Sequence, residues 1–516
     1  MGETGQRRRL FQAVCVLCGA LALVPVWVPR YPPMTDLPQH AAQVALYVDH
    51  VEGGQGPFSD RFRTNYFTPV IGGYAVAFAA ARLVPARTAL KVILSAALIG
   101  LVLVTLAHVR RTGGDDWWLV PVFATLASFP FHWGFYNFLV AMPLALALLL
   151  LARRFIAAPT LPLAAALAAG AVVMFFFHAL AFAFATGAAG LAVVLARLDI
   201  RWKGAGLAAL ASPLPLVVLW LLAVRTGVAD STTPNVWDAG LHRLLLMVTL
   251  PFGYFSSLLT LAGGTFLLAY PFLDGARPSG RISDWAPAIA CAGVLLAAPL
   301  SFMGTGLVYP RFAALLLPCV LIALARPGGG RREGAAERPR QGAARERREG
   351  SAQAASAPAR VRPWRLAALA VTLVMLGESA WAAVAHARED TLASVLEGAP
   401  PDRRMLYVPL EPGSSHYDYD IHLHSGAWYA SEVGGITDFS FAEYFPAPFP
   451  YAPGHAPGLY DLPNDPDGFS WQDFRGERYD LFLVRSEEDP TERVFSGAPE
   501  TPSLRVASPP WWLYER

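Results

Sequence analysis

Residues 161–196 read LPLAAALAAGAVVMFFFHALAFAFATGAAGLAVVLA, a run with no acidic residue, no lysine and no arginine. Residues 285–302 form a second uncharged block. Uninterrupted apolar runs of about 18 or more residues are typical of helices that cross the hydrocarbon core of a bilayer. The chain of 516 residues is 54% hydrophobic and only 16% charged. These blocks therefore predict a polytopic membrane protein.

The placement of basic residues predicts the orientation of the chain, because cytoplasmic loops carry the excess of Lys and Arg. Arg7–Arg9 place the N-terminus in the cytoplasm and the first loop, residues 29–68, on the outer side. The same rule makes residues 118–152 and residues 160–196 helical hairpins. Their outer turns contain His132, Trp133 and Asn137 in the first hairpin and His178 in the second.

One segment does not follow this charge rule easily. Residues 69–86 and 88–108 are both apolar, yet two full spans here would invert everything downstream and put a strongly basic segment outside. We therefore expect one of the two to be re-entrant or interfacial, which gives 11 spans. A further half-span within residues 241–256 would allow both and give 12. The predicted fold is an all-α polytopic membrane bundle of about 11–12 spans.

Composition divides the chain into four parts. Residues 1–325 form the predicted transmembrane region, and residues 326–363, rich in Arg, Gly, Ala and Glu, read as a disordered basic cytoplasmic linker. Residues 364–387 form the last transmembrane helix. Residues 388–516 are richer in Tyr, Asp, Pro and Gly and predict a small extracytoplasmic mixed α/β domain, with buried strands at 405–410 and 479–485.

A second polar pattern lies in this C-terminal domain, where residues 416–424 alternate polar and apolar. On a β-strand the polar members would share one face. Such a face has enough ligands for a metal ion, but it is flat, and metal sites usually gather ligands from several elements. A solvated face, or one that contacts an acceptor, is the favoured interpretation. The polar members are His416, Asp418, Asp420, His422 and His424.

The first loop contains the strongest chemical signal. Asp36 and His40 follow the first span closely, and Pro38 is suited to the first turn of a helix. Asp36 would then lie at or before the helix cap and His40 about one turn later, on a similar face. A carboxylate and an imidazole so placed can act as a general base with an orienting partner. The alternative, in which Asp36 only caps the helix and His40 is an interfacial side chain, stays open.

Three short segments together resemble a known family. They are Thr35–His40, the stretch Trp133-Gly-Phe-Tyr-Asn-Phe138, and Tyr309-Pro-Arg-Phe312 at the start of a late apolar helix. Their order and the predicted topology over residues 1–390 are similar to the C-type (GT-C) membrane glycosyltransferases, which use polyprenyl-phosphate sugars. The common motif of that family has two acids close together, whereas here a single acid is followed by a histidine. No cofactor is firmly predicted, and dependence on a divalent metal stays open.

The resemblance implies transfer of a sugar from a polyprenyl-phosphate carrier to a glycan or protein acceptor on the outer face of the cytoplasmic membrane. It implies Asp36 as the base, with His40 as its orienting partner or as a second proton acceptor. Arg311 would stabilise the departing phosphate. The remaining candidates are Arg61 and Arg63 for the phosphate, Asn65 and Tyr66 for the acceptor path, and His132, Trp133, Asn137 and His178 for contacts with donor or acceptor.

Two other functions remain in competition. The first is a non-catalytic membrane scaffold of envelope polysaccharide assembly, since one acidic residue is the main catalytic signal. The second is a transporter of a lipid-linked substrate, for which repeat halves or paired deep charges would be expected. Nucleic acid is not an expected partner, because the basic residues do not gather on one soluble face.

Overall fold

The computed structural model describes most of the chain. The described residues are 3–52, 57–227, 235–238, 240–253, 257–326, 362–443, 447–456 and 469–516. Apart from its two ends, the predicted linker 326–363 lies outside the described residues.

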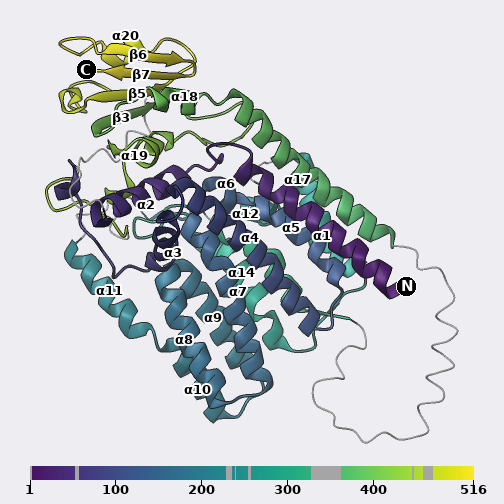
Figure 1. Cartoon of the computed structure of the whole chain (residues 1–516). Coiled ribbons are helices and arrows are strands. Elements are labelled where there is room, and N and C mark those ends of the chain that lie inside the picture. The colour runs from purple at the N-terminus through teal and green to yellow at the C-terminus, as the bar shows by residue number, and fades with distance from the viewer. Residues whose placement is uncertain are drawn as a thin grey trace, which may run out of the picture.

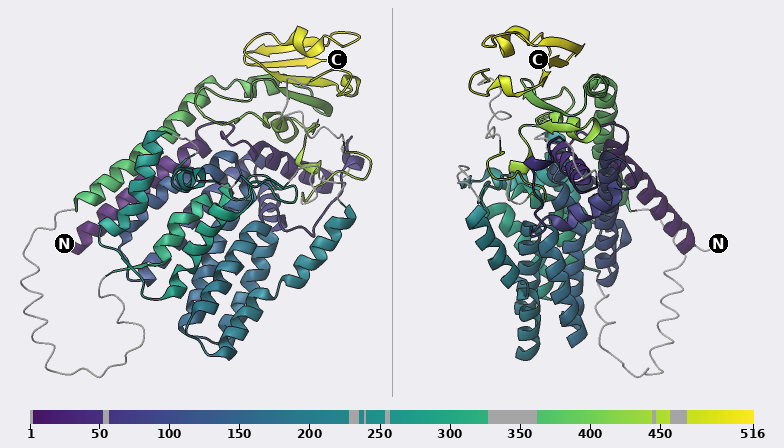
Figure 2. Two further views of the ribbon diagram at one scale, coloured as in Figure 1. Left: turned by 180° about the vertical axis from the view of Figure 1, so that it is seen from behind. Right: turned by 60° about the vertical axis from the view of Figure 1, so that its left-hand side comes forward.

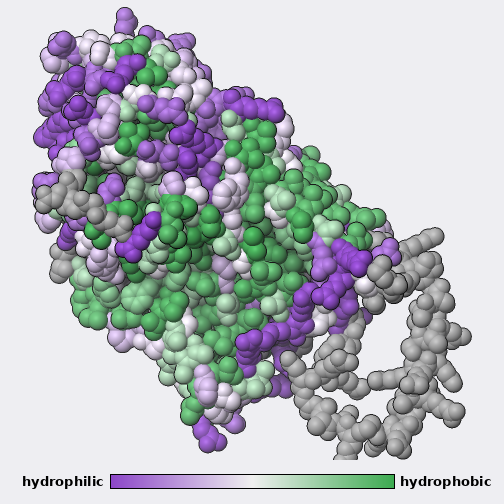
Figure 3. All heavy atoms as spheres, viewed as in Figure 1, coloured by the Kyte–Doolittle hydropathy of each residue, from purple (hydrophilic) through white to green (hydrophobic). Residues whose placement is uncertain are grey.

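The described residues form a helical bundle with a small sheet at one end (Figure 1). By length and composition, five of their helical stretches can cross a membrane, and seven shorter apolar helices accompany them. Hydrophobic residues cover the helical part of the surface in Figure 3, whereas hydrophilic residues gather over the sheet. The chain is therefore a multi-pass membrane protein, as predicted. The five long stretches are Gly5–Trp27, Ala86–Arg111, Tyr136–Ala157, Ile200–Ala223 and Pro363–Glu397.

The first half of the bundle begins with a long helix and continues through the loop that follows it. Its helices are α1 (Glu3–Trp27), α2 (Leu37–Glu52), α3 (Ile71–Ala81), α4 (Ala86–Arg111), α5 (Val120–Ala124), α6 (Phe129–Trp133), α7 (Tyr136–Ala157), α8 (Leu161–Phe177) and α9 (Ala179–Leu195).

The second half is assembled from shorter helices and closes with a long one. Its helices are α10 (Ile200–Ala211), α11 (Leu214–Gly227), α12 (His242–Thr249), α13 (Leu258–Leu273), α14 (Ala286–Ala297), the 3₁₀ helix η6 (Pro310–Leu315), α15 (Leu316–Ile322) and α17 (Pro363–Glu389). A two-residue ladder joins β1 (Arg277–Pro278) to β2 (Leu324–Ala325).

The segment that did not follow the charge rule contains one short and one long helix. α3 has 11 residues, which corresponds to about 16 Å of helix and is short of the ~30 Å hydrocarbon core. α4 has 26 residues and is long enough alone. The predicted hairpin 118–152 is less regular than expected on its first side. There Pro121 and Pro130 begin separate short helices, and Gly134 ends α6 with φ of +80°.

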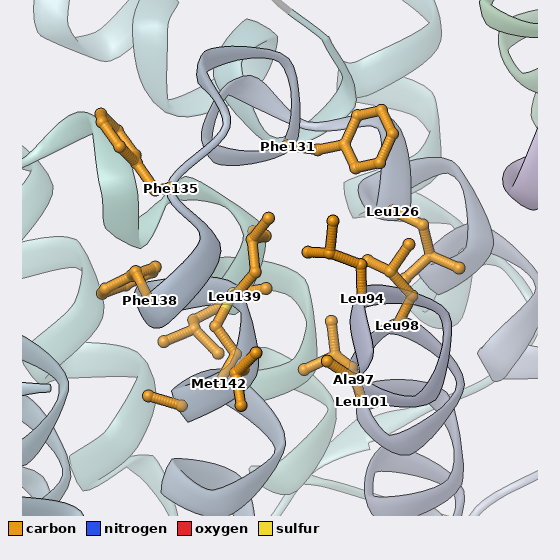
Figure 4. Close-up of a cluster of buried hydrophobic side chains, with 14 of the residues drawn as sticks. Leu94, Ala97, Leu98, Leu101, Leu126, Phe131, Phe135, Phe138, Leu139 and Met142 are labelled. Carbon is orange, nitrogen blue, oxygen red and sulfur yellow. The ribbon is translucent and has the colours of Figure 1, made fainter. Parts of the chain in front are cut away.

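The core of the bundle is formed where α4 packs along α7. Figure 4 shows Leu94, Leu98 and Leu101 of α4 turned toward Leu139 and Met142 of α7. Phe131 and Phe135 lie above these side chains in Figure 4 and Phe138 lies beside Leu139, and all three rings are nearly inaccessible to solvent. This apolar core supports the turn between α6 and α7, on which the polar residues described below rest.

The C-terminal domain is a five-stranded mixed sheet with strand order β4-β3-β5-β7-β6. β3 is parallel to β4 and β5, and β7 is antiparallel to β5 and β6. The predicted strands at 405–410 and 479–485 correspond to β3 and β5, and the mixed α/β class is confirmed. Its elements are α18 (Leu392–Glu397), β3 (Arg403–Pro409), α19 (Trp428–Glu432), β4 (Gly435–Thr437), β5 (Leu481–Arg485), α20 (Thr491–Phe495), β6 (Ser503–Ser508) and β7 (Trp511–Glu515).

Residues 416–424 do not form the strand on which their polar members would share one face. The segment is a series of turns that leads into α19. Tyr417 and Tyr419 are nevertheless buried while Asp418 and Asp420 are exposed, so the alternation reports burial and not a strand. His422 and His424 are also buried. The polar side chains therefore do not form one flat face.

The C-terminal domain rests directly on the first loop, and both views in Figure 2 show the sheet at the same end of the bundle as α2. Gln39 of α2 pairs with the backbone of Phe439 and Phe441, and Gln43, one turn later, pairs with Phe449 through both its amide atoms. Because Gln carries one donor and one acceptor group, each side chain satisfies the domain's backbone as a neighbouring strand would. Segments 388 or more residues apart in sequence thus form one structure.

Candidate functional site

Asp36 lies immediately before α2, with its backbone fixed by the turn between α6 and α7. The Asp36 amide donates to the carbonyl of Trp133 at 2.9 Å, and the Thr35 amide donates to that of His132 at 3.2 Å. A Cβ atom on Gly134 would lie 2.9 Å from the amide nitrogens of Asp36 and Leu37. Glycine is therefore required at 134 both by its positive φ and by this close approach. Two of the motifs identified in the sequence form a single unit here.

The carboxylate of Asp36 is paired with a histidine of the C-terminal domain. Nε2 of His424 lies 3.3 Å from Oδ1 of Asp36, and both side chains are largely buried. The His424 ring stacks on Phe439 with a centroid separation of 4.9 Å. Its Nδ1 atom is buried and has no hydrogen-bond partner among the described residues. The partner of Asp36 is thus His424, not His40 as the loop spacing predicted.

His40 instead points into a cluster of aromatic rings. Its Nδ1 lies 2.5 Å from the hydroxyl of Tyr74, and Tyr136 and Phe441 flank its ring. Burial, together with the positive charges of Arg311 and His424, lowers the pKa of His40 to about 3. A neutral imidazole can accept a hydrogen bond from the Tyr74 hydroxyl at Nδ1 and donate one from its other nitrogen, Nε2. His40 lies one turn into α2, and its side chain points away from Asp36 toward Tyr74 of α3.

Arg311 supplies positive charge near these groups. Its guanidinium lies 3.5 Å from the centroid of the Phe135 ring, and its Nε and Nη2 atoms donate to the carbonyls of Leu307 and Gly306. It is close enough to Asp36 and His40 for their charges to interact. Among the carboxylates that the structure describes, none forms an ion pair with it. A guanidinium held by carbonyls and an aromatic face keeps its charge available to an anion.

His178 and His132 lie in the two hairpins that the sequence predicted, His178 at the turn before α9 and His132 in α6. His178 caps α9, where its Nδ1 accepts from the Ala181 amide at 3.5 Å, and its ring meets Phe138 edge to face. His132 lies 2.8 Å from the hydroxyl of Tyr419, which donates to the carbonyl of Pro33. His132 therefore joins the C-terminal domain to the start of the first loop.

Asn137 and Trp133 flank the same turn. Asn137 hydrogen-bonds the hydroxyl of Tyr74, which connects it to His40. Its Oδ1 atom is buried without a partner among the described residues. The Trp133 ring stacks on Phe129 at 5.8 Å. The polar groups around Tyr74 thus extend from α2 through α3 to α7.

The four candidates later in the first loop lie against another part of the C-terminal domain. The segment from Arg61 to Asn65 pairs with residues 447–452, through an isolated bridge from Phe62 to Tyr451 and backbone bonds on either side. Asn65 also donates to the carbonyl of Ala447 at 3.3 Å. Arg63 and Tyr66 are exposed. These residues join the loop to the domain.

Within the described ranges, no group of three or more His, Cys, Asp and Glu side chains is arranged to hold a metal ion. The structure brings together three groups that can take part in catalysis. They are the Asp36 carboxylate with its imidazole partner, the neutral His40 with Tyr74, and the Arg311 guanidinium. A carboxylate held by an imidazole can accept a proton, and a nearby guanidinium can stabilise a departing anion.

The sequence analysis did not identify His424 and Tyr74 as members of this site. His424 was noticed only as part of an alternating pattern, and 388 residues separate it from Asp36 in the chain, so no spacing could reveal the contact. Tyr74 lies inside an apolar stretch, where its hydroxyl gave no distinct signal.

Comparison with known proteins gives the fold. No protein-family profile matches the chain, and no curated protein matches its sequence. The solved structures that match over nearly its whole length include two of ArnT from Cupriavidus metallidurans. The apo structure has a TM-score of 0.54 at 11% identity, and the structure bound to undecaprenyl phosphate has 0.55 at 13%. In each case 99% of this chain and 98% of that chain are covered. This chain therefore has the fold of ArnT, which is the GT-C fold that the resemblance implied.

Proposed function

We propose that the protein is a membrane glycosyltransferase that moves a sugar from a polyprenyl-phosphate carrier to a glycan or protein acceptor. The observation that supports this most strongly is the pairing of Asp36 with His424 beside the unpaired charge of Arg311. The shared fold supports it independently, because ArnT was solved with undecaprenyl phosphate bound. In a protein that served only as a scaffold, the carboxylate of Asp36 would not need a guanidinium such as Arg311 nearby.

In the proposed reaction, Asp36 accepts the proton of the acceptor hydroxyl as its oxygen attacks the anomeric carbon of the donor sugar. The bond from that carbon to the phosphate oxygen breaks, and the electron pair leaves with the polyprenyl phosphate. Arg311 stabilises the negative charge that develops on the phosphate. His424 holds the carboxylate in place, since an imidazole N–H fixes one oxygen and leaves the other to the acceptor.

The proposed orientation follows from the same geometry. The first loop and the C-terminal domain form one structure around Asp36, so they belong to the same side of the membrane. The basic residues at the opposite helix ends favour that opposite side as the cytoplasmic one. We therefore place the site on the outer face of the cytoplasmic membrane, with the N-terminus inside.

The test is sugar transfer in membranes that contain the protein, supplied with radiolabelled polyprenyl-phosphate sugars and candidate envelope acceptors. Transfer should depend on the protein and disappear with Asp36→Asn. Asp49→Asn is the matched control, because it removes an exposed carboxylate from α2, the helix that begins directly after Asp36. Protein-dependent transfer that is equal in wild type and Asp36→Asn would contradict the role given to Asp36. No transfer with any donor would favour the scaffold function.

A further inference from the structure

A cavity of about 340 Å³ opens at the end of the bundle away from Asp36. It lies between the last turns of α4 and α7, the body of α9 and the segment that leads into α14. Asn137 at the start of α7 belongs to the candidate site, whereas Arg154 near its end lines the cavity. At 1.5 Å per residue these positions are about 26 Å apart. Figure 1 shows α10, which follows α9, at the pole opposite the sheet. The cavity is therefore separate from the site already described.

Positive charge dominates the lining of this cavity. Of its lining residues, four are arginines and one, Asp284, is acidic. Asp284 is already engaged by Arg153 at 3.1 Å and by the hydroxyl of Ser279 at 2.5 Å. Arg153 also donates to the carbonyl of Ile322, so it is part of the scaffold. Within the described part of the chain, Arg111 and Arg154 form no ion pair.

The charged and apolar parts of the lining lie at different depths. Arg111, Arg154 and Arg281 are exposed and surround the mouth. Leu149, Ala189 and Ala192 are buried and form the inner walls. The volume is in the range of about 300–1,000 Å³ that is usual for small-molecule sites. A cationic mouth above an apolar interior matches an amphiphile with an anionic head, and a soluble anion would fill only the mouth.

We propose that this cavity binds an anionic membrane phospholipid, with its phosphate among Arg111, Arg154 and Arg281 and its hydrocarbon against the inner walls. Each guanidinium group can donate two parallel hydrogen bonds to phosphate oxygens. A phosphate head group therefore fits a cluster of three arginines. Basic pockets between helix ends are recognised lipid-headgroup sites on the cytoplasmic side of membrane proteins. The lipid would bridge α4, α7 and α9, and would stabilise the folded chain by binding it preferentially.

The experiment uses the full chain purified in a neutral detergent, with lipid binding followed by native mass spectrometry and by the thermal unfolding temperature. The probes are phosphatidylglycerol, phosphatidylcholine, inorganic phosphate and a polyprenyl phosphate. The cavity variant is Arg111→Gln with Arg154→Gln and Arg281→Gln. The control removes the same charge with Arg8→Gln, Arg197→Gln and Arg201→Gln, which are exposed and do not line the cavity.

Phosphatidylglycerol should remain bound and raise the unfolding temperature of the wild type and of the control, whereas phosphatidylcholine should not. The cavity variant should lose affinity for phosphatidylglycerol by about tenfold or more. If the triple variant does not fold, Arg154→Gln alone should still weaken binding several-fold. Equal binding by cavity variant and control would overturn the proposal. Competition by inorganic phosphate at the lipid's own concentration would reduce the site to an anion site, and tighter binding of the polyprenyl phosphate would overturn the assignment to a phospholipid.

Discussion

At the end of the bundle away from the sheet, Asp115 and Asp274 are surrounded by guanidiniums, whereas Asp36 at the other end faces a single imidazole. Arg365 pairs with both carboxylates, Arg326 adds a contact to Asp115, and Arg362 approaches Asp274 at 3.7 Å. Arg365 lies in the first turn of α17, Arg362 directly precedes that helix and Arg326 directly follows β2, so the cluster joins segments on either side of the predicted linker. Its carboxylates are neutralised within the fold.

The difference between the two ends separates a structural carboxylate from a chemical one. A buried carboxylate paired with arginines holds its neighbours in place, and it is a weaker base toward a substrate proton because the positive charges favour its ionised form. Among the described residues, Asp36 has an ion-pair contact with His424 at 3.3 Å and a cation, Arg311, that lies nearby without pairing with it. Loss of Asp115 or Asp274 should therefore damage folding, and loss of Asp36 should damage chemistry.

The largest expected effect on stability is that of Asp274→Asn. It leaves the largely buried Arg365 without one of its two carboxylates, and breaking such a pair costs about 3 kcal/mol. The thermal unfolding temperature of the purified protein measures this loss. Asp116→Asn is the matched control: it breaks an exposed ion pair with Arg110 and should cost less than about 1 kcal/mol. Equal effects of the two substitutions would contradict the structural role given to Asp274.

Substitution of Arg311 should mainly affect turnover. Arg311→Gln removes the charge that stabilises the departing phosphate and should lower the turnover number by about 100-fold or more. Arg311→Lys should restore part of the rate, since it keeps the charge but not the planar fork. Arg63→Gln, which alters an exposed residue of the first loop, should have little effect. A larger loss of turnover with Arg63→Gln than with Arg311→Gln would assign the phosphate-binding role to Arg63.

The buried histidines predict how stability depends on pH. The pKa of His40 is about 3 in the folded chain, against about 6.5 when unfolded. The unfolded state therefore binds the extra proton below about pH 6.5, and stability falls as the pH decreases from there toward 3. Between pH 6.5 and 5 His40 alone contributes about 2 kcal/mol of this loss.

His422 adds to the same loss, because burial and the charge of Arg485 hold its pKa well below the usual value. Thermal unfolding at pH 7 and pH 5 should show a smaller acid loss in His40→Gln than in wild type. His242→Gln, which alters a half-exposed histidine, should leave the loss unchanged. An acid loss identical in wild type and His40→Gln would show that His40 is not buried in its neutral form.

The smallest expected effect is that of His424→Gln. Gln can still donate one hydrogen bond to Asp36 but does not reproduce the stacked ring, so turnover should fall about tenfold with the donor KM unchanged. His455→Gln, on the exposed surface of the same domain, is the control. A rise in KM without loss of turnover would assign His424 to donor binding instead.

Much of the fold follows from the sequence because hydrophobic length and charge are local signals. The uncharged run 161–196 predicted α8 and α9 with His178 between them, and the charge rule identified residues 69–108 as anomalous before α3 proved short. The segment 416–424 shows the limit of periodicity. Its alternation of polar and apolar residues reflects the burial of Tyr417 and Tyr419 against neighbouring residues. The backbone there forms turns and does not pair as a strand.

The candidate site was predictable only in part. Asp36 and His40 share one short motif, so their nearness was evident, but the helix that begins between them turns the two side chains to different partners. The contact of Asp36 with His424 depends on the docking of the whole C-terminal domain through Gln39 and Gln43. No local pattern in the sequence encodes that docking.

The most direct test is to measure donor affinity and turnover separately for wild type and Asp36→Asn, with purified protein and a polyprenyl-phosphate sugar. Asn keeps the shape of the side chain and removes its ability to accept a proton. We expect unchanged donor affinity and a turnover number lower by about 10²–10⁴-fold, the usual contribution of a general base. Equal turnover in the two proteins would contradict the assignment of Asp36 as the base.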